Sequence, residues 1–151
     1  MLNRFARFSL AIAEIHRCWH KLAAEEMAKY DLNSAHAFYL TTLIQYPEGI
    51  TAARLCEICE KDKAAISRIV AELEEAGLVQ RLERNGTRYR ATLVLTPSGR
   101  EAAEVVSRTA KWAVERAGEG LTDADREVFY RVLALIAENL HAICKDGLRS
   151  E

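Results

Sequence analysis

The stretch "DKAAISRIVAELEEAGLV", residues 62–79, decides the fold of this chain. Its apolar residues recur at helical spacing and form a stripe that can pack inward, made of Ile66, Ile69, Val70, Leu73 and Leu78. Asp62 is placed to cap the helix and Gly77 to end it. The opposite face carries small residues and a few cations near its start. The pattern therefore predicts a helix over residues 62–77 whose outer surface can approach another molecule closely.

The residues before this helix predict three further helices. Residues 3–29 read as one long helix with apolar residues spaced 3 and 4 apart. Asn33 or Ser34 can cap a second helix through Tyr46, and Thr51 can cap a short third one. A short helix, a tight turn and the helix over 62–77 then follow one another, which is the order of a helix–turn–helix.

The residues after it predict a β-hairpin and two more helices. "LVQRLER" and "RYRATLVLT" have the composition of strands, and "NGT" supplies the turn between them. Thr96 and Pro97 open a helix that runs to about Ala117, and Thr122 caps the last one. The predicted fold is mainly α with a small β-hairpin wing, that is, a winged helix–turn–helix domain flanked by N- and C-terminal helices. Both terminal helices carry more apolar surface than one small core uses, so we expect a second copy of the chain to cover it.

Charge and composition restrict the classes of function. The chain has 151 residues and a net charge of −1, but residues 61–100 hold eight basic and five acidic residues, a local charge of +3. No apolar run approaches the roughly 20 residues that cross a bilayer. The N-terminal segment is charged throughout, unlike a secretory signal. We therefore expect a cytoplasmic protein with no membrane partner and free cysteines.

The outer face of the helix over 62–77 suits the major groove of double-stranded DNA. Ala64, Ser67 and Ala71 remove bulk, so that the backbone can approach base edges. Ser67 can donate to a phosphate or a base, and Arg68 can bind guanine or a phosphate. Acidic residues follow only in the last turns, where we expect them to face solvent or a partner. The predicted DNA contacts of this region are Lys61, Lys63, Ala64, Ser67 and Arg68.

The hairpin predicts a second DNA contact. Arg84, Arg88 and Arg90 surround its "NG" turn, and Glu83 is the one acid between residues 81 and 90. At least one guanidinium is expected to reach the adjacent minor groove or its phosphates. A solvated, charged turn is the alternative explanation.

No motif in the sequence supports catalysis or a resident cofactor. The seven glycines form no P-loop or dinucleotide pattern, and GxSxG and HExxH are absent. Cys56 and Cys59 form a lone CxxC without a second pair, which favours core packing over zinc. His16 and His20 lie one helical turn apart, so a metal site is an alternative to a place at the dimer edge or in a sensor cavity. We expect neither an enzyme nor a bound metal.

Aromatic and histidine side chains predict a cavity for a small molecule. A flat organic ligand suits aromatic residues with polar tips. The candidates are His16, Trp19, His20, His36, Tyr39 and Trp112. Ordinary core packing is the alternative, and Phe38 is assigned to the core. Cys18 is a candidate oxidant-sensing thiol, with an unreactive cysteine as the alternative.

The segments "GITAARLCEICEKDKAAISRIVAELEEAGLVQR" and "LVLTPSG" resemble the MarR family of transcriptional regulators, and the similarity extends over nearly the whole chain. The resemblance implies a homodimer whose terminal helices intertwine and whose two winged domains read adjacent half-sites of a palindromic operator. It also implies release of DNA by a small phenolic or otherwise lipophilic molecule, or by an oxidant. The family's wing usually carries Asp-x-Arg, but Thr87 and Tyr89 occupy those positions, which leaves open which arginine enters the groove.

The resulting division of the chain has three parts. Residues 1–32 form the N-terminal dimerisation helix, residues 33–97 the DNA-binding domain with its wing over 79–96, and residues 98–151 the C-terminal dimerisation helices. The predicted function is a sequence-specific DNA-binding regulator, a homodimeric repressor released by a ligand. A redox- or metal-responsive regulator of the same fold and a winged helix that binds another protein are the alternatives.

Overall fold

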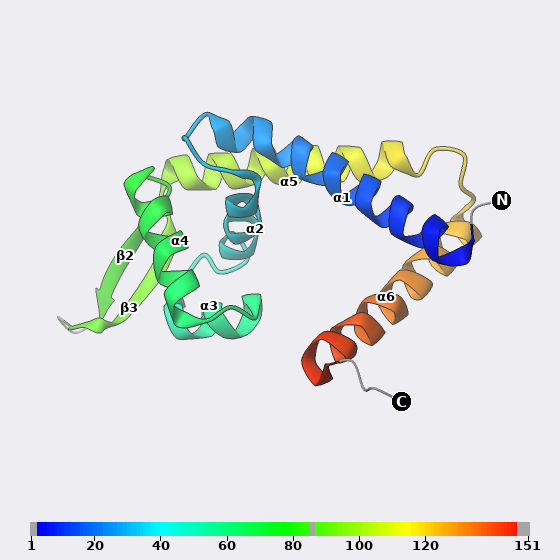
Figure 1. The fold of residues 1–151 in the computed structure, drawn as a ribbon. Coiled ribbons are helices and arrows are strands. Elements are labelled where there is room, and N and C mark those ends of the chain that lie inside the picture. The colour runs from blue at the N-terminus through cyan, green and yellow to red at the C-terminus, as the bar shows by residue number, and fades with distance from the viewer. Residues whose placement is uncertain (1–2, 85–86, 148–151) are drawn as a thin grey trace. The chain divides into compact units, whose positions relative to one another are not determined.

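The computed structural model describes residues 3–84 and 87–147, and the side chains of residues 84–90 lie outside that description. The elements follow the predicted order (Figure 1). They are α1 (Arg4–Ala28), α2 (Ser34–Leu43), β1 (Ile50–Thr51), α3 (Ala52–Cys59), α4 (Lys63–Glu75), β2 (Val79–Arg84), β3 (Thr87–Leu95), α5 (Pro97–Ala117) and α6 (Asp123–Asp146). The predicted fold class, mainly helical with a small β-sheet wing, is confirmed. The "NG" of the predicted turn, residues 85 and 86, lies outside the described residues.

Helix α4 is fixed at both ends by the residues that the sequence singled out. The Asp62 side chain accepts a hydrogen bond from the Ala65 amide at 2.7 Å, which satisfies one free donor of the first turn. After the last turn, Gly77 has φ +74°, a left-handed conformation that glycine adopts without strain. The helix covers 13 residues and is therefore three residues shorter than the range 62–77, because Asp62 is its cap and Gly77 lies beyond its last turn.

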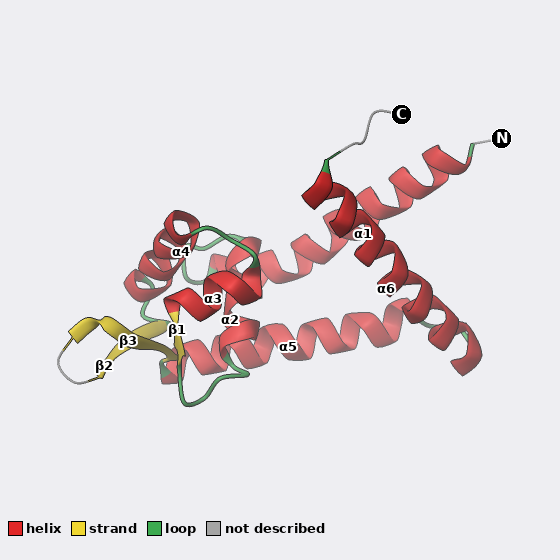
Figure 2. Ribbon diagram, turned by 90° about the horizontal axis from the view of Figure 1, so that it is seen from below, coloured by secondary structure: helices red, strands yellow, loops and turns green. Residues whose placement is uncertain are grey.

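The hairpin is part of a three-stranded antiparallel sheet in the order β1-β3-β2 (Figure 2). Val79 pairs with Leu95 and Arg81 with Leu93, and the register shifts between Leu82 and Arg84. The short strand β1, which the sequence pattern did not predict, adds Ile50 opposite Leu93. Only two residues long, it is too short to show an alternating pattern.

Strand β3 is buried over its whole C-terminal half rather than on alternate residues. Ala91, Thr92, Leu93, Val94 and Leu95 are each at most 9% exposed. Leu93 and Leu95 face the main core, and the loop at Gly49 covers the other face. A Cβ atom built on Gly49 would lie 2.8 Å from the Thr92 Cβ and 3.0 Å from a Val94 methyl group. Both faces of this part of β3 are therefore covered, one by the core and the other by the loop.

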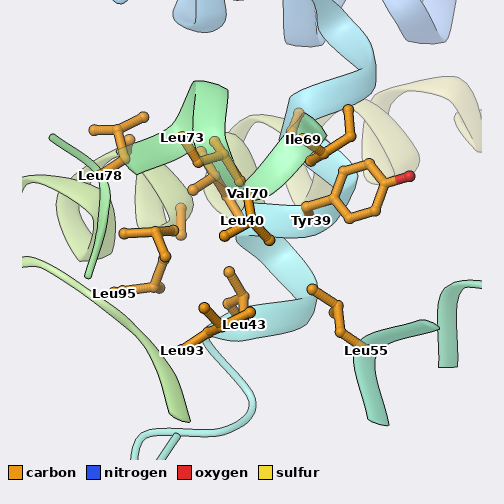
Figure 3. Close-up of a cluster of buried hydrophobic side chains, with 14 of the residues drawn as sticks. Tyr39, Leu40, Leu43, Leu55, Ile69, Val70, Leu73, Leu78, Leu93 and Leu95 are labelled. Carbon is orange, nitrogen blue, oxygen red and sulfur yellow. The ribbon is translucent and has the colours of Figure 1, made fainter. Parts of the chain in front are cut away.

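One apolar core holds α4 in place within residues 3–112. Its inward stripe, predicted from the sequence, is buried: Ile66, Ile69, Val70 and Leu73 are each at most 8% exposed. Figure 3 shows Val70 and Leu73 packed near Leu40 of α2. Side chains from α3 and β3 complete the cluster, among them Leu55, Leu93 and Leu95. The outer face of α4 is thereby presented to solvent.

The chain divides into two compact units, Met1–Trp112 and Ala113–Glu151, with α5 beginning in the first and ending in the second. In the second unit the Thr122 hydroxyl accepts from the Asp125 amide and the Asp125 carboxylate accepts from the Thr122 amide, a capping box that confirms Thr122 as the predicted cap. Helix α6 has no buried residue. No helix in residues 3–84 or 87–147 combines the length and apolar composition needed to cross a bilayer.

Candidate nucleic-acid interface

The outer face of α4 is a set of small and basic side chains with little covering it. We call this set the reading face, and every member is exposed: Lys63, Ala64, Ser67, Arg68 and Ala71. Among the described residues, neither Lys63 nor Arg68 forms an ion pair, so both cations remain available to an anionic partner. The structure thus brings four of the predicted DNA-contact residues together on one face of one helix.

The acidic residues of α4 differ from the prediction that they face solvent or a partner. Glu72 accepts a hydrogen bond from Nε2 of His36 at 2.5 Å, and Glu74 accepts one from Nε of Arg81 at 3.0 Å. Glu75 alone of the three is exposed. Two carboxylates are therefore engaged by cationic or donor side chains of the same chain, and this leaves the charge of the reading face positive.

Lys61 lies beside the reading face but is not on α4. It follows Glu60, which ends α3 in a left-handed conformation with φ +51°. Its amide donates to the Cys56 carbonyl at 3.1 Å, and its side chain is exposed. The backbone of the α3–α4 turn therefore places this cation directly before the N-terminal end of α4, where phosphate binding is favoured.

For the three arginines predicted for the wing, the structure describes the backbone but not the side chains. Arg84 ends β2, and Arg88 and Arg90 belong to β3, so the backbone confirms that all three lie on the hairpin. Their side chains lie outside the described residues, and their contact with DNA stays a prediction. Arg81 at the base of the hairpin is paired with Glu74 and links β2 to α4.

A cavity of about 500 Å³ lies within the first unit, bounded by residues of α1, α2 and α5. Three aromatic side chains line it, Trp19, Phe38 and Tyr39, together with His20 and Lys61. Phe38 is 55% exposed, so its assignment to the core was wrong. The Phe38 and Tyr39 rings meet edge to face with centroids 5.6 Å apart. An aromatic rim with few polar groups is the composition of a small-molecule site.

The other three candidates for this cavity lie elsewhere. His16 and Trp112 are exposed and do not line it, and His36 is buried beside Glu72. Their role in ligand binding stays a prediction without support from the cavity. The sequence did not point to Lys61 as a lining residue, because a loop lysine gives no signal of the concave surface beside it.

Tyr39 connects the cavity to the reading face. Burial raises the pKa of the Tyr39 hydroxyl and the nearby Cys59 raises it further, while the Arg68 guanidinium lowers it. The hydroxyl therefore stays protonated at neutral pH and can donate to a ligand. The hydroxyl also lies within electrostatic range of the Arg68 guanidinium.

Neither the histidine pair nor the CxxC forms a metal site in the described part of the chain. The His16 and His20 rings stack with centroids 4.2 Å apart, and Nδ1 of His20 lies 2.7 Å from the Ser34 hydroxyl. Within residues 3–84 and 87–147 no three His, Cys, Asp or Glu side chains gather as metal ligands would. Burial raises the pKa of the Cys59 thiol, Cys56 raises it further, and this thiol belongs to the apolar core. These observations support core packing for the CxxC.

We expect Cys18→Ser to leave the response of DNA binding to peroxide unchanged. Cys18 is exposed, and its thiol donates to a Glu14 carboxylate oxygen at 3.6 Å. Sensor thiols are activated by neighbouring cations, whereas the guanidinium of Arg17, the residue before Cys18, is bound by Glu14 at 2.6 Å. A peroxide titration of DNA affinity for both proteins is the measurement. If peroxide lowered the DNA affinity of the wild type but not of the serine variant, Cys18 would be established as the sensor.

Comparisons with known proteins agree with this geometry. Residues 30–88 match the family model described as MarR family, whereas no curated protein matches the chain in sequence. A solved Listeria monocytogenes protein assigned to the MarR family of transcriptional regulators, complexed with a 26mer DNA, is 21% identical with a TM-score of 0.74 over 100% of this chain and 99% of that one. S. aureus MepR in a DNA complex is 16% identical with a TM-score of 0.75, over 87% and 97%.

A third solved structure extends the likeness to another source. A MarR transcriptional regulator from Methanosarcina mazei Go1 is 21% identical with a TM-score of 0.72, over 90% of this chain and 97% of that one. At these identities the similarity shows a shared fold. Residues 30–88 thus resemble the MarR family in sequence, and the chain as a whole shares the fold of these solved regulators.

Proposed function

We propose that the chain is a cytoplasmic, sequence-specific transcriptional regulator that binds double-stranded DNA and catalyses no reaction. The observation that carries this proposal is the reading face of α4. It is exposed, its other three side chains are small, and neither Lys63 nor Arg68 is engaged in an ion pair among the described residues. Two proteins of the same fold were solved with DNA, which supports the same partner here.

The dependence of affinity on salt tests this function. Each phosphate contact steepens the fall of log affinity with log salt by about 0.9. We therefore expect anisotropy titrations of a labelled duplex to give a steep negative slope. The rival function, a winged helix that docks on another protein, predicts weak DNA binding at all salt concentrations. A slope near zero would favour that rival.

We further propose that the regulator is a homodimer held by α1 and α6. Both helices expose large apolar side chains, among them Phe5 at 77%, Ile15 at 60% and Leu135 at 55%. Large apolar side chains exposed along each of these helices are typical of a protein interface. A two-fold dimer would present two copies of the reading face to half-sites about one helical turn apart, roughly 34–36 Å. The proposed operator is accordingly palindromic.

We expect Phe129→Asp to weaken the dimer at least about tenfold, because an interface that buries a carboxylate without a partner loses on the order of 1.4 kcal/mol or more. Phe129 is 47% exposed on α6 in the single chain. Sedimentation velocity at several concentrations measures the shift from dimer to monomer. Glu138→Gln, an exposed polar position on the same helix, is the control and should behave like the wild type. An unchanged dimer in the Phe129 variant would place the interface elsewhere.

We propose that a small aromatic or lipophilic effector binds the cavity and releases DNA, which makes the regulator a repressor. Trp19 lines the cavity and Trp112 does not, so Trp112→Phe leaves one tryptophan that reports on it. We expect an aromatic effector to quench the emission of this variant and to lower its DNA affinity over the same concentration range. In Trp19→Phe the remaining Trp112 should not respond. Quenching without any loss of DNA affinity would show that a ligand in the cavity does not control DNA binding.

A further inference from the structure

The buried histidine of α2 contacts the helix that carries the reading face. His36 is 3% exposed and is the third residue of α2. Its Nε2 lies 2.5 Å from an oxygen of Glu72, 36 positions away in the sequence. Because a carboxylate only accepts hydrogen bonds, Nε2 carries the proton in this contact. The link therefore holds one carboxylate of α4 toward α2.

The other ring nitrogen anchors His36 to the start of its own helix. With the proton on Nε2, Nδ1 accepts a hydrogen bond from the Asn33 amide at 3.3 Å, which is one half of the capping box of α2. Oδ1 of Asn33 lies 3.0 Å from Nδ1 and accepts from the Ala35 amide at 3.0 Å. Held at both nitrogens and buried, the imidazole has one orientation, and that orientation aims Nε2 at Glu72.

Glu72 lies in the position from which it could neutralise Arg68. Residues four apart on a helix lie one above the other on the same face, and an acid and a base at that spacing attract each other. Arg68 and Glu72 have this spacing, yet they form no ion pair: the Glu72 carboxylate binds His36, and Arg68 remains exposed. The Arg68 guanidinium lies within electrostatic range of Tyr39, which follows His36 by about one turn of α2. The contact with His36 thus keeps the Glu72 carboxylate apart from Arg68.

We propose that His36 is a positioning residue for DNA binding, which withholds the Glu72 carboxylate from Arg68 and so keeps that guanidinium free for DNA. This inference rests on the proposed function of the reading face. Without the imidazole donor, the nearest cation on the same helix stripe for Glu72 is Arg68. The resulting pair would compete with DNA for the guanidinium and would place a carboxylate close to the phosphates.

Two substitutions separate the contact with Glu72 from the contact with Asn33. In His36→Asn the shorter side chain keeps a polar group near the Nδ1 position but does not reach Glu72. In His36→Gln the longer amide keeps a donor near the Nε2 position. We expect His36→Asn to bind duplex DNA about fivefold more weakly than the wild type, the effect of one partly exposed ion pair. His36→Gln should bind like the wild type.

The deciding variant is the double substitution His36→Asn with Glu72→Gln. Once the competing charge is gone, Arg68 is free again, so we expect the double variant to regain the affinity of Glu72→Gln alone. Glu75→Gln, which removes an exposed acid from the same helix, calibrates the general effect of one negative charge. Thermal unfolding of each variant, with His36→Phe as a ring that fills the same site, shows whether the fold is retained.

The outcomes distinguish this inference from the proposed function. A wild type that binds no duplex in a salt-dependent way overturns the proposed function. A wild type that binds, with His36→Asn and His36→Phe binding equally well, overturns the role of His36. If His36→Asn binds DNA weakly and the double variant with Glu72→Gln binds it equally weakly, then His36 only supports the fold. The proposal that it keeps Glu72 away from Arg68 would then be wrong.

Discussion

Gly99→Ala is expected to destabilise the chain by roughly 3 kcal/mol, although alanine is the better helix former. Gly99 lies in the first turn of α5 and is buried. A Cβ atom at this position would lie 1.8 Å from the carbonyl oxygen of Leu78. That oxygen accepts a hydrogen bond from the Thr96 amide at 3.0 Å, so the backbone that would have to move is held. Helix propensity alone predicts the opposite sign, a gain of about 1 kcal/mol.

Urea unfolding followed by circular dichroism measures this effect. Gly120→Ala is the matched control, because Gly120 has φ +86° and a Cβ atom there would have no neighbour within 4 Å. Its cost comes from backbone strain only, about 1 kcal/mol. A Gly99 variant as stable as the wild type would mean that α5 does not pack on Leu78 as described.

Arg68→Ala is expected to weaken binding of the preferred operator by about 1–3 kcal/mol, or roughly 5- to 150-fold. Arg68 is exposed at the centre of the reading face between Ala64 and Ala71, where a guanidinium can bind guanine in the major groove. If it reads a base, the loss should be larger for the operator than for unrelated DNA. If it binds a phosphate, both losses should be equal and the salt slope should fall by about one contact.

Competition titrations with operator and unrelated duplexes measure both effects. Arg108→Ala is the control, since Arg108 is an exposed cation of α5 outside the reading face. It should change the affinity only slightly and equally for both duplexes. Equal losses in the Arg68 and Arg108 variants would show that the reading face has no special part in binding.

The elements that local chemistry determines could be predicted from the sequence. The ends of α4 follow from Asp62 and Gly77, and its buried face follows from apolar residues at helical spacing. The Thr122–Asp125 box likewise starts α6 where predicted. Each of these depends on residues within a few positions of one another. Such features can be read from one chain without its tertiary contacts.

The features that depend on distant residues could not be predicted. The bond between His36 and Glu72 joins two helices, and nothing near either residue in the sequence indicates the other. The exposure of Phe38 depends on where α1 and α5 lie, because these helices leave a cavity where the sequence suggested a filled core. The need for glycine at position 99 also depends on a backbone oxygen 21 residues earlier, whereas "TPSG" by itself indicates only a helix start.

Selection of bound sequences from random duplex DNA is the direct test of whether the exposed side of α4 reads a DNA groove. We expect enrichment of one palindrome with half-sites about one helical turn apart. If Arg68 reads a base, Arg68→Ala should relax the selected bases; if it binds a phosphate, the variant should select the same palindrome with a lower affinity. Recovery of no common sequence by the wild type, or of the same palindrome with unchanged affinity by the variant, would contradict this reading of DNA by α4.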